Sequence, residues 1–154
     1  MGDKGSHLGE ALEKKCSDIG SIDVLVGILG KNVETTILHV LNVVNEGLYG
    51  YFPEYKKAIV VSIGSTADSD RTFELAEMFQ PYNGVEKIIT EDVCGKGKGA
   101  GIRTVLEVAD HLDAKSVVLV DGDLLSIRPK WIESIAGPIM YGRADLTVPY
   151  YICL

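Results

Sequence analysis

Two kinds of hydrophobic pattern alternate along the chain. Short runs of continuous apolar residues are typical of strands buried on both faces of a sheet, and apolar residues that recur every three or four positions are typical of helices with one buried face. The predicted strands are residues 22–29, 58–63, 85–90 and 116–120, with a last strand that begins near Leu146. The predicted helices run from Val33 to Leu48, from Ser69 or Asp70 to just before Pro81, from Ile102 to Leu112, and from Pro129 to about Tyr141.

This order of elements predicts the fold. Strands that alternate with helices are joined by right-handed crossovers, which make the strands parallel and place helices on both faces of the sheet. We therefore expect a three-layer, doubly wound, Rossmann-like α/β fold around a mainly parallel sheet. Ligands of such sheets bind at the carboxyl ends of the strands, so functional residues are expected in the loops that follow the strands.

Composition narrows the classes of protein that the chain can belong to. The chain has 154 residues, of which 46% are hydrophobic, and this is enough to form the core of one domain rather than a disordered protein. Three cysteines, scattered without a paired spacing, exclude a disulfide scaffold. No apolar run approaches the ~20 residues of a membrane helix, and the start lacks a signal-peptide pattern. The formal charge of -7 argues against nucleic acid as the main partner. We expect a cytoplasmic domain without a membrane segment.

The two ends of the chain differ from the rest. Residues 1–20 are predicted to form an N-terminal arm, in which residues 1–7 (MGDKGSH) are typical of a tag or a loose arm and a helix follows. Residues 21–154 are predicted to form one domain. Residues 146–154 (LTVPYYICL) are apolar and strand-like with no cap or turn, so we expect a domain truncated at its carboxyl end. A sheet cut in this way exposes an edge that can pair with a second copy as a homodimer.

The most informative motif is Asp121-Gly122-Asp123, directly after the apolar strand SVVLV. Two carboxylates one residue apart at the end of a strand can point into the same crevice, and the glycine keeps the backbone accessible. Hard oxygen ligands with open coordination positions suit Mg²⁺ or Mn²⁺ bound to a diphosphate. The alternative is an ordinary acidic turn, but its place after a buried strand favours a metal site.

A second motif is the glycine- and lysine-rich loop of residues 94–101 (CGKGKGAG), which opens a helix. Glycines let backbone N–H groups approach an anion, the helix N-terminus is electropositive, and Lys96 and Lys98 add positive charge. The spacing fits neither a P-loop nor the dinucleotide fingerprint of a first strand–helix turn. A solvated loop without a ligand is the alternative interpretation.

Other polar residues carry less specific information. Gly64-Ser65-Thr66 follows the second strand and could meet a ribose or a base. Asn32 follows the first strand, where the cap of the next helix is the simplest interpretation. We expect structural roles for His39 and His111.

In this order the motifs resemble the nucleotide-binding half of the GT-A glycosyltransferase fold, as in family 2 transferases. The features that carry the resemblance are Asn32 and Glu34 near the end of the first strand, Gly64-Ser65-Thr66 after the second, the Gly-Lys-Gly loop, and Asp-x-Asp after the fourth. The resemblance covers residues 22–149. Residues 95–97 (GKG) and 136–140 (AGPIM) are also similar to the retaining glucosyl- and mannosyl-3-phosphoglycerate synthases.

The resemblance implies roles for individual residues. It implies that Asp123 ligates a metal on the donor diphosphate and that Asp121 lies near the ribose or a metal-bound water. Lys96 or Lys98 would face the base or the phosphates. The other positions implied to border the nucleotide-sugar are Leu29, Asn32, Glu34, Gly64, Ser65, Gly97 and Gly122.

Two positions depart from the family pattern. The family usually has an acid directly after the asparagine of the first loop, where this chain has Val33, with Glu34 one position later. It also usually has an aspartate near the end of the second strand, where this chain has Ser62 and Ile63. Both acids normally help to hold the nucleoside.

The function implied is transfer of a sugar from a UDP- or GDP-linked donor to a hydroxyl of a small-molecule or glycan acceptor, dependent on Mg²⁺ or Mn²⁺. Catalytic and acceptor residues are expected beyond Leu154, so this chain is expected to bind a nucleotide but to lack transfer activity. One alternative is a non-catalytic nucleotide- or partner-binding domain of the same fold. The other is a nucleotidyltransferase, although residues 27–32 (GILGKN) lack the glycine-rich loop with arginine that such enzymes carry after the first strand.

Overall fold

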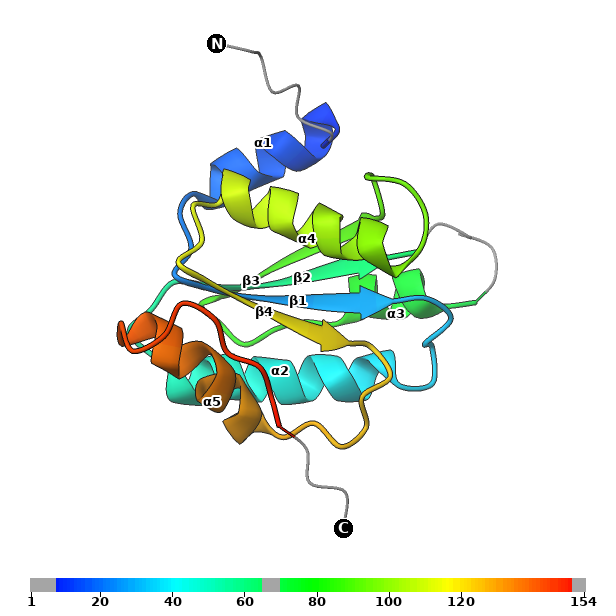
Figure 1. Ribbon diagram of the computed structural model, residues 1–154. Helices are drawn as coiled ribbons and strands as arrows, with labels where there is room; N and C mark the ends of the chain where they lie inside the picture. Colours follow the sequence, from blue (N-terminus) through cyan, green and yellow to red (C-terminus); the bar gives the residue numbers. More distant parts are fainter. Residues whose placement is uncertain (1–7, 65–69, 151–154) are drawn as a thin grey trace.

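The computed structural model of the chain describes residues 8–64 and 70–150. Within these residues the chain has an α/β fold with a four-stranded, all-parallel sheet in the order β3-β2-β1-β4 (Figure 1). The strands are β1 (Val24–Gly30), β2 (Lys57–Ile63), β3 (Val85–Glu91) and β4 (Ser116–Asp121). The helices are α1 (Glu10–Ile19), α2 (Ile37–Tyr51), α3 (Thr72–Met78), α4 (Lys98–His111) and α5 (Pro129–Met140).

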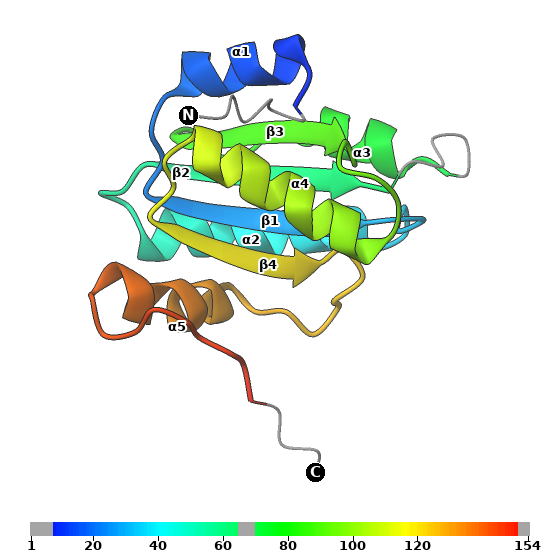
Figure 2. The ribbon, with the colours of Figure 1, turned by 45° about the horizontal axis from the view of Figure 1, so that its top comes forward.

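The helices cover both faces of the sheet and make three layers. α1 and α4 pack on one face, and α2, α3 and α5 pack on the other (Figures 1 and 2). Alternate residues of β1 enter the two cores, because side chains of a strand point to opposite faces in turn. Val26 and Ile28 belong to the α2–α5 core, whereas Leu25 packs in the α4 core. Burial on both faces explains why the strands are continuous apolar runs.

α4 packs closely on β1. Gly27 in β1 lies directly under Val105 of α4, and a Cβ atom at this glycine would overlap the side chain of Val105. The absence of a side chain lets the helix approach the sheet. The first turn of α4 is thereby held beside the carboxyl ends of the strands.

Two expectations about the elements are wrong. α2 begins at Ile37 rather than at Val33, and Thr36 rather than Asn32 occupies its N-cap position. Asn32 has a φ of 53°, a left-handed conformation in which asparagine is tolerated, so the chain turns there before the helix starts. Residues 146–150 form no strand. Thr147 instead donates a hydrogen bond from Oγ1 to the carbonyl of Ile135 in α5 (2.8 Å), and residues 151–154 lie outside the described part.

The remaining boundaries agree closely with the sequence pattern. α1 is the helix expected in the N-terminal arm, and α3 ends before Pro81 as predicted. None of the helices in residues 8–64 and 70–150 has both the length and the apolar character needed to span a membrane.

Candidate functional site

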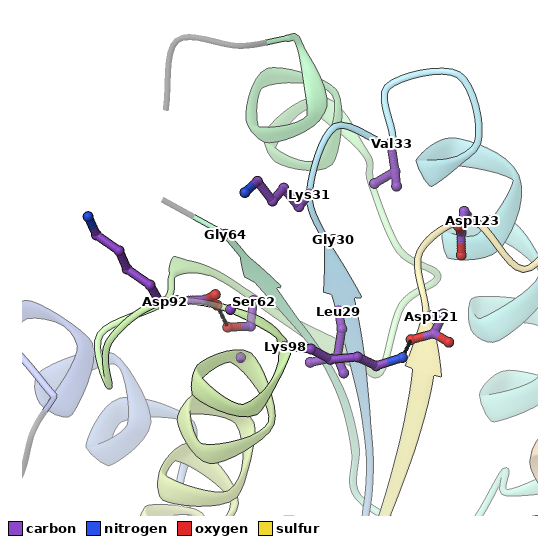
Figure 3. Close-up of a pocket in the computed structure, with 13 residues that line it drawn as sticks. Leu29, Gly30, Lys31, Val33, Ser62, Gly64, Asp92, Lys98, Asp121 and Asp123 are labelled. Atoms are coloured by element: carbon purple, nitrogen blue, oxygen red, sulfur yellow. Dashed lines mark hydrogen bonds and ion pairs between the residues drawn. The ribbon is translucent and has the colours of Figure 1, made fainter. Parts of the chain in front are cut away.

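The loops that follow all four strands meet around one pocket of about 360 Å³ at the carboxyl edge of the sheet (Figure 3). Parallel strands bring their carboxyl ends to the same edge, which is why residues far apart in sequence line a single cavity. The lining residues are Leu29, Gly30, Lys31, Val33, Ser62, Gly64, Asp92, Lys96, Gly97, Lys98, Gly101, Asp121 and Asp123.

Most of the candidates from the sequence are brought together here. Those that line the pocket are Leu29, Gly64, Lys96, Gly97, Lys98, Asp121 and Asp123. Gly122 is buried within the turn between the two aspartates. Asn32 and Glu34 do not line the pocket, and Ser65 lies outside the described residues.

The acidic turn after β4 is held tightly against β1. The backbone N–H of Gly122 donates to the carbonyl of Leu29 (2.8 Å), and Thr36 Oγ1 donates to the carbonyl of Gly122 (2.8 Å). A Cβ atom on Gly122 would lie 3.0 Å from the backbone oxygen of Leu29, so only glycine allows this approach without a shift. The turn thereby presents the exposed carboxylates of Asp121 and Asp123 to the same cavity.

The donor set of this turn fits a metal that arrives with a ligand. No group of three or more His, Cys, Asp or Glu side chains within the described ranges is placed to hold a metal ion. Asp121 and Asp123 supply carboxylate oxygens, and Mg²⁺ is commonly bound by one or two carboxylates together with waters and substrate phosphates. The residues present therefore suit Mg²⁺ or Mn²⁺ bound jointly with a diphosphate better than a cage made by the protein alone.

The start of α4 brings positive charge across the pocket to the acidic turn. Gly97, with a φ of 87°, occupies the N-cap position, and Lys98 is the first helical residue. The ammonium group of Lys98 lies 2.7 Å from Asp121 Oδ1 (Figure 3). A cation at a helix N-terminus is disfavoured by the helix dipole, and an anion is favoured there. Asp121 supplies that negative charge, and Lys31 and Lys96 add two further cations to the lining.

A third carboxylate, which the sequence analysis did not select, lies on the opposite side of the pocket. Asp92 directly follows β3, and its Oδ1 accepts a hydrogen bond from Ser62 Oγ of β2 (Figure 3). Its backbone N–H donates to the carbonyl of Ile63 (2.9 Å), which fixes the residue against the end of β2. Asp92 therefore places a carboxylate beside Ser62 at the end of β2. Its position directly after a predicted strand is the signal that could have identified it.

Glu34, which the resemblance implies to border the nucleotide-sugar, does not line the pocket. Its carboxylate accepts the backbone N–H of Arg71 (2.8 Å), and its own backbone N–H donates to Asp70 Oδ2 (3.1 Å). Burial raises the pKa of Asp70, but hydrogen bonds from Thr72 and from the Glu34 backbone outweigh this and hold the pKa below its usual value. Thr72 Oγ1 also accepts the backbone N–H of Val33 (2.9 Å). These bonds tie the loop after β1 to the start of α3.

The histidines that the structure describes lie away from the pocket. His39 Nε2 bonds the carbonyl of Leu125 (3.0 Å), and His111 Nδ1 bonds the carbonyl of Glu107 (2.9 Å) in its own helix. Both have the structural partners expected of them. Cys94 is a free, partly buried thiol that does not line the pocket.

No family model matches the chain, and no curated protein or solved structure matches it either. Any function for the pocket therefore has to follow from the chemistry of its own residues.

Proposed function

We propose that this pocket binds a nucleoside-diphosphate sugar, and that the chain is the donor-binding part of a metal-dependent glycosyltransferase of the GT-A type. The observation that carries the proposal is that a pair of carboxylates and a group of lysines line the same cavity. The carboxylates of Asp121 and Asp123 face the lysine-bearing N-terminus of α4, and the Lys98–Asp121 ion pair links them.

The dimensions of the sheet edge suit such a ligand. β2 and β4 are separated by β1 alone, so Ser62 and Asp121 lie about two strand spacings, or ~10 Å, apart. A nucleoside diphosphate can place its diphosphate at β4 and its base at β2 and β3. Leu29 lies between these two ends (Figure 3) and offers an apolar surface to the ribose or base.

The acidic and basic residues would have different roles at the diphosphate. Asp121 and Asp123 would hold Mg²⁺ or Mn²⁺, which supplies positive charge that stabilises a departing diphosphate. Lys98 and Lys96 would bind phosphate oxygens, and the first N–H groups of α4 would add further donors. Together these groups favour the charge that develops when the bond between the sugar and the diphosphate breaks.

A non-catalytic nucleotide-binding domain of the same fold is the second candidate. The observation that favours it is the position of Glu34. Its carboxylate accepts a hydrogen bond from the Arg71 backbone outside the pocket, so the loop after β1 contributes no acid to the site. Both candidates predict nucleotide binding, and dependence on a divalent metal separates them.

Calorimetric titration with UDP and GDP, each with and without Mn²⁺, tests the proposal. We expect binding that requires Mn²⁺ and that weakens at least about tenfold in Asp123→Ala, since even indirect partners of a bound metal contribute about that much. Asp110→Ala is the matched control, because Asp110 is an exposed acid at the far end of α4. Binding that ignores both Mn²⁺ and Asp123→Ala would favour the non-catalytic domain. Absence of nucleotide binding would contradict both candidates.

A further inference from the structure

The carboxylate of Asp92 has no use in binding a diphosphate, which it would repel. It lies at the end of the pocket away from Asp121 and Asp123, and Ser62 holds one of its oxygens (Figure 3). An ionised carboxylate only accepts hydrogen bonds, and each of its oxygens can accept two. Oδ1 can therefore keep the Ser62 hydroxyl and accept another donor, while Oδ2 accepts no hydrogen bond from residues 8–64 and 70–150.

Gly101 keeps this carboxylate open to the cavity. A Cβ atom at position 101 would lie 3.3 Å from Asp92 Oδ1 and 3.5 Å from Oδ2, so a side chain there would cover both oxygens. It would also lie 3.4 Å from Leu29 Cδ2, which lines the same cavity. Both oxygens of Asp92 are thus presented together to whatever occupies this end of the pocket.

The nucleobases differ in what they offer to a pair of carboxylate oxygens. Guanine carries N1–H and the exocyclic amino group side by side, so it can donate two parallel hydrogen bonds to one carboxylate. Uracil has a single N–H flanked by two carbonyl oxygens, which repel the second carboxylate oxygen. Adenine and cytosine place a ring acceptor beside their amino group. Among these bases, guanine alone can donate one hydrogen bond to each oxygen of the carboxylate.

We propose that Asp92, positioned by Ser62, selects guanine, so that the donor is a GDP-linked sugar. The inference rests on the proposed function, because it assigns the base of the nucleotide bound there. The guanine edge would meet Asp92 at the ends of β2 and β3, and the diphosphate would reach Asp121 and Asp123 at the end of β4. A polar group placed to bond one base rejects a base that lacks the partner, since the group is then left desolvated and unpaired.

Affinities of GDP, IDP, UDP and XDP, measured with Mn²⁺ present, test this selection. IDP lacks only the exocyclic amino group, so we expect it to bind about tenfold more weakly than GDP, and UDP more weakly still. Asp92→Asn replaces one acceptor oxygen by a donor amide, which matches the N1–H and the C2 carbonyl of xanthine. We expect this variant to reverse the preference, so that XDP binds more tightly than GDP.

The control is Glu91→Gln, which makes the same change of charge at the neighbouring exposed residue outside the pocket lining. It should leave the order of the four nucleotides unchanged. The ratio between nucleotides is measured on a single protein sample, so it does not depend on the fraction that is folded. Mn²⁺-dependent binding of UDP as tight as GDP, or an unchanged GDP-to-XDP ratio in Asp92→Asn, would overturn guanine selection and leave the proposed function standing. Failure of all four nucleotides to bind would overturn both.

Discussion

The positive charge of Lys98 has opposite effects on the two proposed ligands, a divalent metal ion and a diphosphate. In the structure its ammonium group neutralises Asp121 at 2.7 Å, across the mouth of the proposed diphosphate site. If a divalent ion binds Asp121 and Asp123, the same ammonium group repels that ion, but it attracts the diphosphate that comes with it. Lys98 should therefore oppose binding of metal alone and favour binding of metal with nucleotide.

Lys98→Met removes the charge and keeps most of the apolar length of the side chain. We expect Mn²⁺ alone to bind up to about fivefold more tightly, the range that follows from an exposed ion pair. Binding of nucleotide with Mn²⁺ should weaken, because a phosphate contact is lost. Titration of free Mn²⁺ followed by electron paramagnetic resonance, and calorimetry for the nucleotide, would measure the two effects. Lys14→Met, an exposed lysine of α1, is the control. An unchanged or weaker affinity for Mn²⁺ alone would contradict this account.

Among the secondary-structure elements, the distance between two packed helices depends on the size of the side chains at their contact. α2 and α5 lie side by side under the sheet, and they meet at Gly47. A Cβ atom on Gly47 would lie 2.7 Å from Ile132 Cγ1 and 2.8 Å from the backbone oxygen of Pro129. The backbone of α5 cannot yield as a flexible side chain would, so this contact sets the distance between the two helices.

Gly47→Ala and Gly50→Ala form a matched pair in the same helix. We expect Gly47→Ala to lower the free energy of unfolding by about 1–3 kcal/mol through overpacking against α5. Gly50 is exposed and has nothing within 4 Å of an added Cβ atom, so Gly50→Ala should raise that free energy by about 0.5–1 kcal/mol. Urea denaturation of both variants measures the difference. Effects of the same sign would show that α2 and α5 do not pack as described.

The pattern of apolar positions predicted most elements to within a few residues, because strands buried on both faces and helices with one buried face leave distinct patterns. It was wrong where contacts outside the segment decide the outcome. The start of α2 depends on the turn at Asn32 and on the bond from Val33 to Thr72, which no local pattern contains. Residues 146–150 have the composition of a strand, but a strand requires a paired neighbour and they have none within the described residues.

Across the whole molecule, the amino ends and the carboxyl ends of the strands differ in how many interactions connect them. At the amino edge, Asp23 Oδ1 lies 2.7 Å from Lys115 Nζ, and Oδ2 accepts the backbone N–H of Lys56 (2.9 Å). These three residues precede β1, β4 and β2, so one carboxylate joins the starts of three strands. At the carboxyl edge the strands end in the open pocket. The amino ends of the strands are therefore linked to one another, and the carboxyl ends are left available for a ligand.

The tie at Asp23 predicts a pH dependence of stability. The hydrogen bond from Lys115, followed by that from the Lys56 backbone, holds the pKa of Asp23 below its usual value. A lowered pKa in the folded state means that the stabilisation is complete above the unfolded value of about 3.9 and is lost as pH falls through the folded value. We expect Asp23→Asn to lower the free energy of unfolding by about 1 kcal/mol at neutral pH.

The difference between wild type and Asp23→Asn should shrink as pH falls below the unfolded value of about 3.9, because the wild-type carboxyl then takes up a proton as well. Urea denaturation at neutral and at acidic pH measures it. Asp110→Asn is the control, because Asp110 is an exposed acid at the end of α4, and it should show no such trend. A difference that stays constant across this pH range would contradict the role assigned to Asp23.

The class of fold and about half of the residues that line the pocket could be predicted from the sequence. Buried parallel strands leave continuous apolar runs, and residues directly after such strands must gather at one edge, so Asp121, Asp123 and Lys98 could be expected to meet. The partner of each polar group, in contrast, depends on contacts between elements. The tertiary structure joined Asp92 to Ser62 from two different strands and turned Glu34 toward Arg71. The physical reason is that hydrogen-bond partners depend on the register and spacing of neighbouring elements, which a periodic pattern along one segment does not encode.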